Sequence, residues 1–470
     1  MREDIISTIQ ARVESFIKRY NMIEPGQGIV IGVSGGSDSL ALLHILWSLR
    51  DKLGIEAVVA HVEHGIRGQQ SLDDARYVME IARHMGLPVY VKHCDVPLYA
   101  REHGLSEEEA GRIIRYEFFG HVCEIRGCSK IAVAHNKNDN AETILFNILR
   151  GTGLDGLVGI KPVVGNIIRP MLDVSKADIE AYCTAAGLNA RKDYTNEDAA
   201  YTRNRIRLKL IPFLEREFNP NIIDSLVRMA NILNDDNEYL KECVREAYEQ
   251  VVHITDGIAV VAAEKFAVLH KAMQRRISRS IICAIKGDIN GIEFFHIEQL
   301  TEYINTSRAG QKLVLPFDIL AERSGDNVYV CTRLKMAHMA EPFCHELAIP
   351  GDTYIKNGQA VVTSCIIDKN SVTDYNSSVF EAYMDIDKIS LPLCVRNRRD
   401  GDRFFPIGSA GHKKLKEYFI DEKIPRVYRD AIPLVASDHE VLWVIGHRLS
   451  DICKVDDSTK KVLKLTYREW

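Results

Sequence analysis

An apolar run at Ile29–Val33 leads directly into the segment SGGSDS, residues Ser34–Ser39, and a helix-like stretch follows at Leu40–Leu49. The run predicts a buried strand of a parallel sheet. The two glycines permit backbone conformations and close approaches that a Cβ atom would prevent. The serines and the aspartate open the next helix, where unpaired N–H groups and the positive end of the helix dipole favour an anion. The segment therefore predicts a phosphate-binding turn between a strand and a helix.

Three further strand-like segments follow, and the intervals between them carry helical patterns long enough to cross a sheet. The segments are Ala57–Val62, Pro88–His93 and Lys130–Ala134. Alternation of strands and helices on this scale predicts the α/β class, with a doubly wound parallel sheet and right-handed crossovers. Ligands of such sheets bind at the carboxyl ends of the strands, which is where the SGGSDS turn lies.

The length of 470 residues fits about three domains. We place an α/β nucleotide-binding catalytic domain at residues 1–217. Asn219 and Pro220 then open a helix that no glycine or proline interrupts until about Val252. We expect a mostly helical middle domain at residues 218–340. Short strands separated by glycine and proline predict a small α+β domain at residues 341–470.

A second polar cluster begins where the fourth strand-like segment ends. His135, Asp139 and Glu142 are spaced by four and three residues, so they lie on one face of a helix. Polar residues on one helix face are commonly only solvated. At the carboxyl edge of a parallel sheet, however, the two carboxylates could hold Mg²⁺ on phosphates or take a proton from a substrate ammonium group.

Three basic clusters are candidates for phosphate contacts. Arg112 and Arg115 lie three residues apart on a predicted helix, where they could contact a triphosphate or an RNA backbone, or pair with nearby glutamates. The segments 201–212 and 395–430 are also rich in basic residues, and the second adds aromatic residues that could stack on bases or pack into a core. The basic residues singled out there are Arg203, Arg205, Arg207, Lys209, Arg398, Arg399, Lys413 and Lys414, and the aromatic ones are Phe404, Phe405, Tyr418, Phe419 and Tyr428.

Composition limits the partners and the compartment. The net charge is −5, so local patches and not the whole chain must account for any binding of nucleic acid. The 11 cysteines include no C-x-x-C pair, which favours free thiols in a reducing compartment. The first residues are charged and include no apolar leader, and no apolar run approaches the length of about 18 residues that a membrane span needs. We therefore expect a cytoplasmic protein that does not contact a membrane.

Taken together, these segments resemble the bacterial tRNA(Ile)-lysidine synthetase family, whose nucleotide loop is the PP-loop of the ATP pyrophosphatase superfamily. No G-x-x-x-x-G-K-[ST] segment occurs, so the P-loop that holds a transferable γ-phosphate is absent. The resemblance extends along nearly the whole chain. It rests on SGGSDS, HVEHGIRG, RIIRYEFF, NDNAETILFNILRGTGLDGL, DYTNEDAAYTRNRIR and the block from GDRFFPIG to KKLKEYFIDEKIPR.

The resemblance implies that L-lysine is joined to the wobble cytidine of the isoleucine tRNA that carries a CAU anticodon. ATP would adenylate the carbonyl oxygen of the cytosine and release pyrophosphate, and the ε-amine of lysine would then displace AMP. The target base sits in a single-stranded loop, where leaving the stack costs little. The modified base would pair with A, so the tRNA would read AUA and be charged with isoleucine.

The resemblance also implies roles for individual residues. ATP would be bound by Ser34, Gly35, Gly36, Ser37, Asp38, Ser39, Arg112 and Arg115. The catalytic residues would be Asp38, His135, Asp139, Glu142 and Arg205, with Mg²⁺ on Asp38 and Asp139. The tRNA would be bound by Arg203 and Arg207 of the first domain and by Arg398, Arg399, Lys413 and Lys414 of the C-terminal domain. The middle domain would bind tRNA as well. Glu63 departs from the asparagine or aspartate expected in its loop, and the sequence leaves open whether the protein is a monomer or a homodimer.

Three other functions share parts of this pattern. A PP-loop tRNA thiolase, the nearest alternative, needs paired catalytic cysteines or an iron–sulfur site, and no such pair stands near the SGGSDS turn. A glutamine-fed ligase needs an N-terminal cysteine nucleophile, whereas the first cysteine here is Cys94. A nucleotide-sensing module without catalysis would not need an acidic and arginine-rich segment at the sheet edge.

Overall fold

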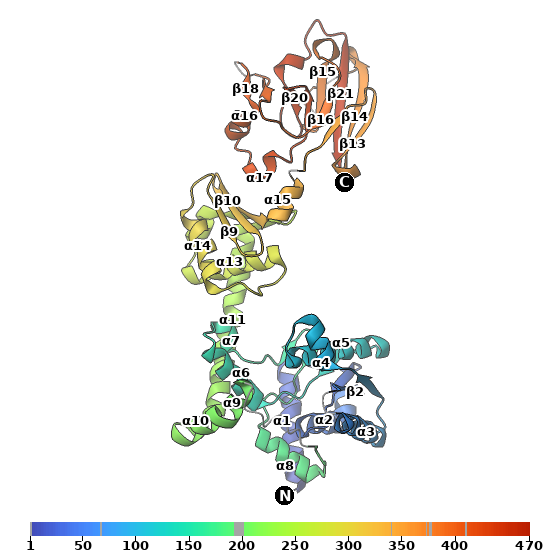
Figure 1. Cartoon of the computed structure of the whole chain (residues 1–470), viewed down its shortest axis with the longest axis vertical. Helices are drawn as coiled ribbons and strands as arrows, with labels where there is room; N and C mark the ends of the chain where they lie inside the picture. Colours follow the sequence, from blue (N-terminus) through green and yellow to red (C-terminus); the bar gives the residue numbers. More distant parts are fainter. Residues whose placement is uncertain are drawn as a thin grey trace. The chain divides into compact units, whose positions relative to one another are not determined.

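The computed structural model describes residues 2–65, 68–191, 202–339, 341–372, 374–375, 378–408 and 411–470. The chain divides into two compact units, Met1–Leu240 and Lys241–Trp470, each of which is described by itself (Figure 1). The three-domain boundaries expected from the sequence stay a prediction.

In the described part of the first unit, a six-stranded sheet has the strand order β3-β2-β1-β4-β6-β5. Strands β3, β2, β1, β4 and β6 are parallel, and β5 is antiparallel to β6. The strands are β1 (Gly28–Gly32), β2 (Glu56–Glu63), β3 (Val89–His93), β4 (Lys130–Ala132), β5 (Val163–Val164) and β6 (Ile167–Ile168). The mostly parallel α/β sheet confirms the predicted fold class, and β1 to β4 lie where strands were expected.

Helices cover both faces of this sheet, because successive side chains of a buried strand point to opposite faces. Ile29 and Ile31 of β1 pack against one set of helices, whereas Val30 packs against the other. The first set comprises α1 (Arg2–Arg19), α2 (Ser37–Leu53), α3 (Gln69–His84) and α8 (Lys176–Ala186), and the second comprises α4 (Val96–His103) and α5 (Glu107–Arg126). The sheet is therefore doubly wound, as predicted.

The remaining helices of the first unit begin with α6, which follows β4. They are α6 (Lys137–Leu149), α7 (Leu154–Leu157), α9 (Thr202–Arg205), the π-helical turn η2 (Ile206–Leu210), α10 (Ile211–Glu217) and the start of α11 (Ile222–Val251). Ile144 of α6, Ile206 of η2 and Ala230 of α11 share one small core. This core fixes the basic segment 202–210 against α6, and α11 is the long helix expected after Pro220.

The second unit begins within α11 and contains three sheets among its described residues. The first is antiparallel, with the order β7-β8-β11-β10-β9. Its elements are β7 (Val252–Thr255), β8 (Ile258–Ala262), α12 (Ala263–Ala267), α13 (Lys271–Lys286), α14 (Phe294–Thr306), β9 (Lys312–Leu315), β10 (Ile319–Ser324), β11 (Asn327–Thr332) and α15 (Arg333–Met339).

The C-terminal region consists of two sheets that share a core containing Val362, Val395 and Trp443. One sheet has the order β12-β16-β19-β20-β17-β18 and the other β13-β14-β21-β15. The elements are β12 (Cys344–Glu346), β13 (Gly351–Ile355), η3 (Lys356–Gly358), β14 (Ala360–Asp368), η4 (Lys369–Ser371), β15 (Glu381–Asp385), η5 (Ile386–Lys388), β16 (Cys394–Arg396), β17 (Arg403–Phe404), β18 (Lys413–Lys414), α16 (Leu415–Asp421), α17 (Arg426–Arg429), β19 (Leu434–Ser437), β20 (Glu440–Val444), η6 (Asp451–Cys453) and β21 (Lys461–Glu469). The region is small and α+β, as predicted.

Candidate active site

The SGGSDS turn lies between the end of β1 and the start of α2. Gly35 has a φ of +94°, which favours glycine. The buried hydroxyl of Ser39 accepts hydrogen bonds from the N–H groups of Ser34 (3.1 Å) and Gly35 (3.2 Å) and donates to the carbonyl of Gly36 (3.0 Å). Ser39 therefore shapes the turn, and Ser37 and Asp38 stand partly exposed at the first turn of α2.

Asp38 links this turn to two distant segments of the chain. Its Oδ1 accepts a hydrogen bond from Nδ2 of Asn136 at 3.2 Å, and its Oδ2 accepts one from Nζ of Lys176 at 2.7 Å. Lys176 also donates to Oγ of Ser37 at 2.9 Å. The predicted phosphate site thus includes the starts of α6 and α8 as well as that of α2.

Asn136 is the N-cap of α6 and holds Asp139 next to Asp38. The side chain of Asn136 accepts a hydrogen bond from the N–H of Asp139 at 3.0 Å, and Oδ2 of Asp139 accepts one from the N–H of Asn136 at 3.0 Å. Asn136 is only 3% exposed. Sequence reasoning missed its role, although an asparagine followed three residues later by an acid is a pattern typical of a reciprocal cap.

Glu142 lies on the same side of α6 as Asp139, as the spacing predicted, and both carboxylates contact Arg207. Glu142 is 1% exposed and accepts two hydrogen bonds from Arg207, at 2.6 and 2.9 Å. Arg207 also donates to Oδ1 of Asp139 at 3.1 Å, and Nε of Arg203 lies 3.5 Å from Glu142. Two acids that hold a guanidinium in this way could equally hold an ammonium group.

Burial and ion pairing shift the pKa of Glu142 in opposite directions. Burial raises the pKa of this carboxyl, the bonds from Arg207 lower it, and the net pKa lies above its ordinary value. The same bonds raise the pKa of Arg207 despite its own burial. Because the arginine side chain is 35% exposed and Glu142 is 1% exposed, the cost of desolvation falls mainly on the acid.

His135 lies at the end of the strand that precedes α6 and contacts Arg169. Nε of the buried Arg169 donates to Nδ1 of His135 at 3.3 Å. Burial, together with the positive charges of Arg169, Arg203, Arg112 and Arg115, lowers the pKa of His135 to about 3. The imidazole is therefore neutral near pH 7 with its proton on Nε2, so it can donate a hydrogen bond there.

Arg112 and Arg115 are exposed on α5, and their charges contribute to the low pKa of His135. Arg169 was not singled out from the sequence. No local signal marks it, because a lone arginine before a proline has no distinctive pattern.

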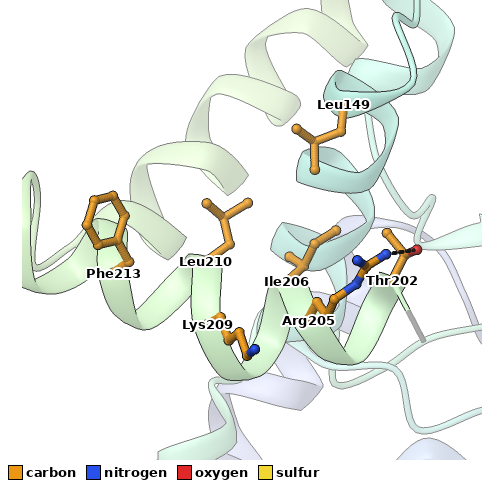
Figure 2. Close-up of a pocket in the computed structure, with 7 residues that line it drawn as sticks. All are labelled: Leu149, Thr202, Arg205, Ile206, Lys209, Leu210 and Phe213. Carbon is orange, nitrogen blue, oxygen red and sulfur yellow. Dashed lines mark hydrogen bonds between the residues drawn. The ribbon is translucent and has the colours of Figure 1, made fainter. Parts of the chain in front are cut away.

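The arginines of segment 202–210 divide between two faces. Arg203 and Arg207 are four residues apart and meet Glu142. Arg205 instead donates a hydrogen bond to Oγ1 of Thr202 at 2.9 Å (Figure 2). There Arg205 and Lys209 border a pocket of about 500 Å³ whose other lining residues are Leu149, Thr202, Ile206, Leu210 and Phe213 (Figure 2). Arg205, predicted to be catalytic, thus faces away from the acids that its neighbours contact.

The basic C-terminal block is less open than its sequence indicates. Arg398 pairs with Asp430, and the exposed Lys413 pairs with Asp421 at 2.9 Å. Arg399 and Lys414 are exposed as well. The block is therefore a mixed surface that leaves some of its cations accessible.

Of the two uses left open for the aromatic residues of this block, three of these residues take the second and pack into a core. Phe404, Tyr418 and Phe419 are at most 2% exposed and form a core with Leu415. Tyr428 packs edge-to-face on Tyr329 at a centroid distance of 5.9 Å. Apolar packing competes with RNA for the same side chains, and the sequence pattern does not distinguish the two.

The loop after β2 was a further candidate for a ligand contact. Oε1 of the buried Glu63 accepts a hydrogen bond from the N–H of Gly65 at 2.7 Å, so this carboxylate shapes the loop. Nδ1 of His61 lies 2.8 Å from the carbonyl oxygen of Val33, at the end of β1. Residues 66 and 67 of the HVEHGIRG segment lie outside the described residues, as do residues 193–201 of the DYTNEDAAYTRNRIR segment.

Within the described ranges, no three His, Cys, Asp or Glu side chains gather closely enough to form a metal site by themselves. Asp38 and Asp139 nevertheless fit Mg²⁺, which is usually held by one or two carboxylates together with substrate phosphates. No helix in the described part of the chain has the length and apolar character needed to cross a bilayer.

Comparison with protein families matches residues 5–214 to the PP-loop domain and residues 393–466 to the TilS substrate C-terminal domain. A tRNA(Ile)-lysidine synthase of Caldanaerobacter subterraneus subsp. tengcongensis is 43% identical over 96% of this chain and 96% of its own length. One from Clostridioides difficile is 37% identical over 97% of this chain and 99% of its own. A solved structure described as the crystal structure of the TILS C-terminal domain is 32% identical and covers 27% of this chain and 98% of that chain, with a TM-score of 0.25.

Proposed function

The chain belongs to the tRNA(Ile)-lysidine synthase family, an ATP-using PP-loop family, and we propose that it joins the ε-amine of L-lysine to the wobble cytidine of the isoleucine tRNA with a CAU anticodon. The observation that carries this proposal is the link from Asp38 through Asn136 to Asp139. Through this link, the turn that suits a nucleotide lies beside the two acids that suit an ammonium group.

In the first step, the carbonyl oxygen of the cytosine attacks the α-phosphorus of ATP. A bond forms between this oxygen and the phosphorus, the bond to the β-phosphate bridge breaks, and pyrophosphate leaves. The N–H groups at the start of α2 and the partly exposed Ser37 favour the pyrophosphate there. Arg112 and Arg115 add positive charge near His135, which suits the triphosphate.

In the second step, the ε-amine of lysine attacks the activated ring carbon, the bond from this carbon to the adenylate oxygen breaks, and AMP leaves. A lysine ammonium has a pKa near 10.4, so it must lose a proton before it can attack. Asp139 and Glu142 would hold the ammonium, and the raised pKa of Glu142 suits a group that accepts this proton. Arg207 contacts both acids, so the incoming ammonium must share them with this guanidinium or displace it.

His135 would donate a hydrogen bond from Nε2 to an oxygen of the nucleotide or the base, because burial keeps it neutral. Mg²⁺ on Asp38 and Asp139 would neutralise phosphate charge when bound. Arg205, which borders the pocket beside Thr202, would contact the tRNA or the reacting groups. These roles are proposals for individual side chains.

The C-terminal region and the middle region would bind the tRNA away from the anticodon, with Arg399 and Lys414 as exposed candidates. The three substrates would meet in the cytoplasm.

The test is to incubate the full chain with ATP, labelled lysine and bulk tRNA and to identify the nucleoside that acquires the label. We expect labelled lysidine in the isoleucine tRNA with a CAU anticodon, and equal amounts of AMP and pyrophosphate. A reaction without ATP is the control. Release of ADP and phosphate, or labelling of a different nucleoside, would contradict the proposal, and incorporation of sulfur instead of lysine would point to the thiolase alternative.

A further inference from the structure

The SGGSDS turn carries no cation of its own. Its residues are glycines, serines and one aspartate, so the turn itself has a negative side chain where a polyanion is expected. The start of a helix supplies the equivalent of only about half a positive charge. Pyrophosphate gains negative charge as it leaves, and catalysis requires donors already in place where that charge develops. The cation must come from another part of the chain.

Lys176 is the described lysine whose ammonium group contacts this turn. Its Nζ lies 2.7 Å from Oδ2 of Asp38 and 2.9 Å from Oγ of Ser37. These contacts use two of the three donors of the ammonium group. The side chain is 36% exposed, so a further acceptor can approach it from solvent.

The main chain of Lys176 is held firmly in this place. Its N–H donates to Oδ1 of Asn138 at 3.0 Å, and the Ser175 side chain caps α8 by accepting from the N–H of Asp178 at 3.1 Å. Lys176 therefore starts a helix that is fixed to the start of α6. A phosphate held by the N–H groups at the start of α2 would lie next to Ser37 and within reach of this ammonium group.

We propose that Lys176 contacts the β- and γ-phosphates of ATP and stabilises the departing pyrophosphate. This role rests on the function proposed above and adds a residue to it. In the absence of nucleotide the ammonium pairs with Asp38, and with nucleotide bound it donates to the pyrophosphate part. The competing explanation is that Lys176 only holds Asp38 and the turn in shape.

The experiment compares the full-length wild-type chain with Lys176→Met, Lys176→Arg and a control, Lys161→Met. Lys161 is also a lysine in an ion pair, 3.2 Å from Glu238, and its side chain is 39% exposed, close to the exposure of Lys176. Calorimetric titrations with α,β-methylene-ATP, inorganic pyrophosphate and AMP give three affinities for each protein. Lysidine formation by the wild-type chain is measured in parallel.

A contact to pyrophosphate predicts a selective loss. A hydrogen bond to a charged group is worth about ten- to a hundredfold in affinity. Lys176→Met should therefore lower the affinity for the methylene analogue and for pyrophosphate by that factor. AMP should bind within about twofold of wild type, because it lacks the part that Lys176 contacts. Lys176→Arg should recover part of the loss, and Lys161→Met should behave as wild type.

Other outcomes overturn the inference. If Lys176→Met lowered the affinities for AMP and for pyrophosphate equally, Lys176 would only shape the turn. The proposed contact would be contradicted if Lys176→Met bound pyrophosphate as tightly as the wild-type chain, or if the wild-type chain did not bind pyrophosphate. A wild-type chain that binds nucleotide but forms no lysidine would instead refute the proposed function, so the two failures are distinguishable.

Discussion

Replacing Arg207 by methionine removes the main counter-charge of the buried Glu142. Arg207 supplies both short hydrogen bonds to this carboxylate, whereas Arg203 approaches it only to 3.5 Å. Removing one partner of a buried pair costs about 3–5 kcal/mol, because the other charge stays buried without compensation. Since Arg203 remains, we take the lower end, about 3 kcal/mol. For a unit of this size, each kcal/mol lowers the melting temperature by about 2–4 °C, so the expected loss is about 6–12 °C.

Replacing Glu142 instead of Arg207 should lower the free energy of unfolding much less. The net pKa of Glu142 lies above its ordinary value, so burial disfavours its charge more than Arg207 favours it. Glu142→Gln keeps the shape and one acceptor, and Arg207 retains Asp139 and partial exposure to water. We expect a change below about 1 kcal/mol. In the double variant no buried charge is left unpaired, so its stability should lie close to that of Glu142→Gln and well above that of Arg207→Met.

The loss in Arg207→Met should also depend on pH. The pKa of Glu142 in the folded variant rises further above the unfolded value, which is near 4.5. As pH rises between these two values, the unfolded chain releases its proton first, so stability falls with increasing pH and levels off above the folded pKa. The double variant lacks this carboxyl and should lack the slope.

The measurement is calorimetric unfolding of the full chain and its three variants at several pH values. Hydrogen exchange of peptides from α6 assigns the relevant transition to the first unit. If Arg207→Met were as stable as Glu142→Gln, or if its stability did not fall from about pH 5 to pH 8, the carboxylate would not carry an uncompensated charge. The proposed balance of burial and pairing would then be incorrect.

Three further predictions concern activity and binding. Asp38→Ala and Asp139→Ala should each abolish ATP-dependent modification of tRNA and leave tRNA binding largely intact in a filter-binding assay; full turnover by either variant would remove that residue from the mechanism. Reversing the charges of Arg399 and Lys414, which are exposed, should reduce the slope of log affinity for tRNA against log salt concentration. The expected reduction is about 0.7–0.9 for each phosphate that these side chains bind, and an unchanged slope would mean that these side chains do not contact RNA. Because the pKa of His135 is about 3, the rate between about pH 5 and pH 8 should show no inflection from this residue, and an inflection near 6.5 that disappears in His135→Asn would contradict its neutral state.

Local patterns were enough to predict much of the first unit. The strand β1, the turn after it and the helix α2 follow from apolar periodicity, paired glycines and a polar helix start, all of which act between neighbours in the chain. The stripe of Asp139 and Glu142 was likewise predictable, because helical geometry alone puts residues three apart on one face. Family membership was predictable too, since it rests on segments spread along the whole sequence.

The contacts that complete the site depend on which elements pack together. Lys176 is 138 positions from Asp38, and Arg207 is 65 positions from Glu142, so no local pattern relates the members of either pair. Burial of Phe404 and Phe419 was equally undetermined, because an aromatic side chain suits a core as well as an RNA base. Sequence by itself determined the chemical groups and their local geometry. Only tertiary packing decided which charges meet and which are removed from water, because both depend on distances between segments that the order of residues does not specify.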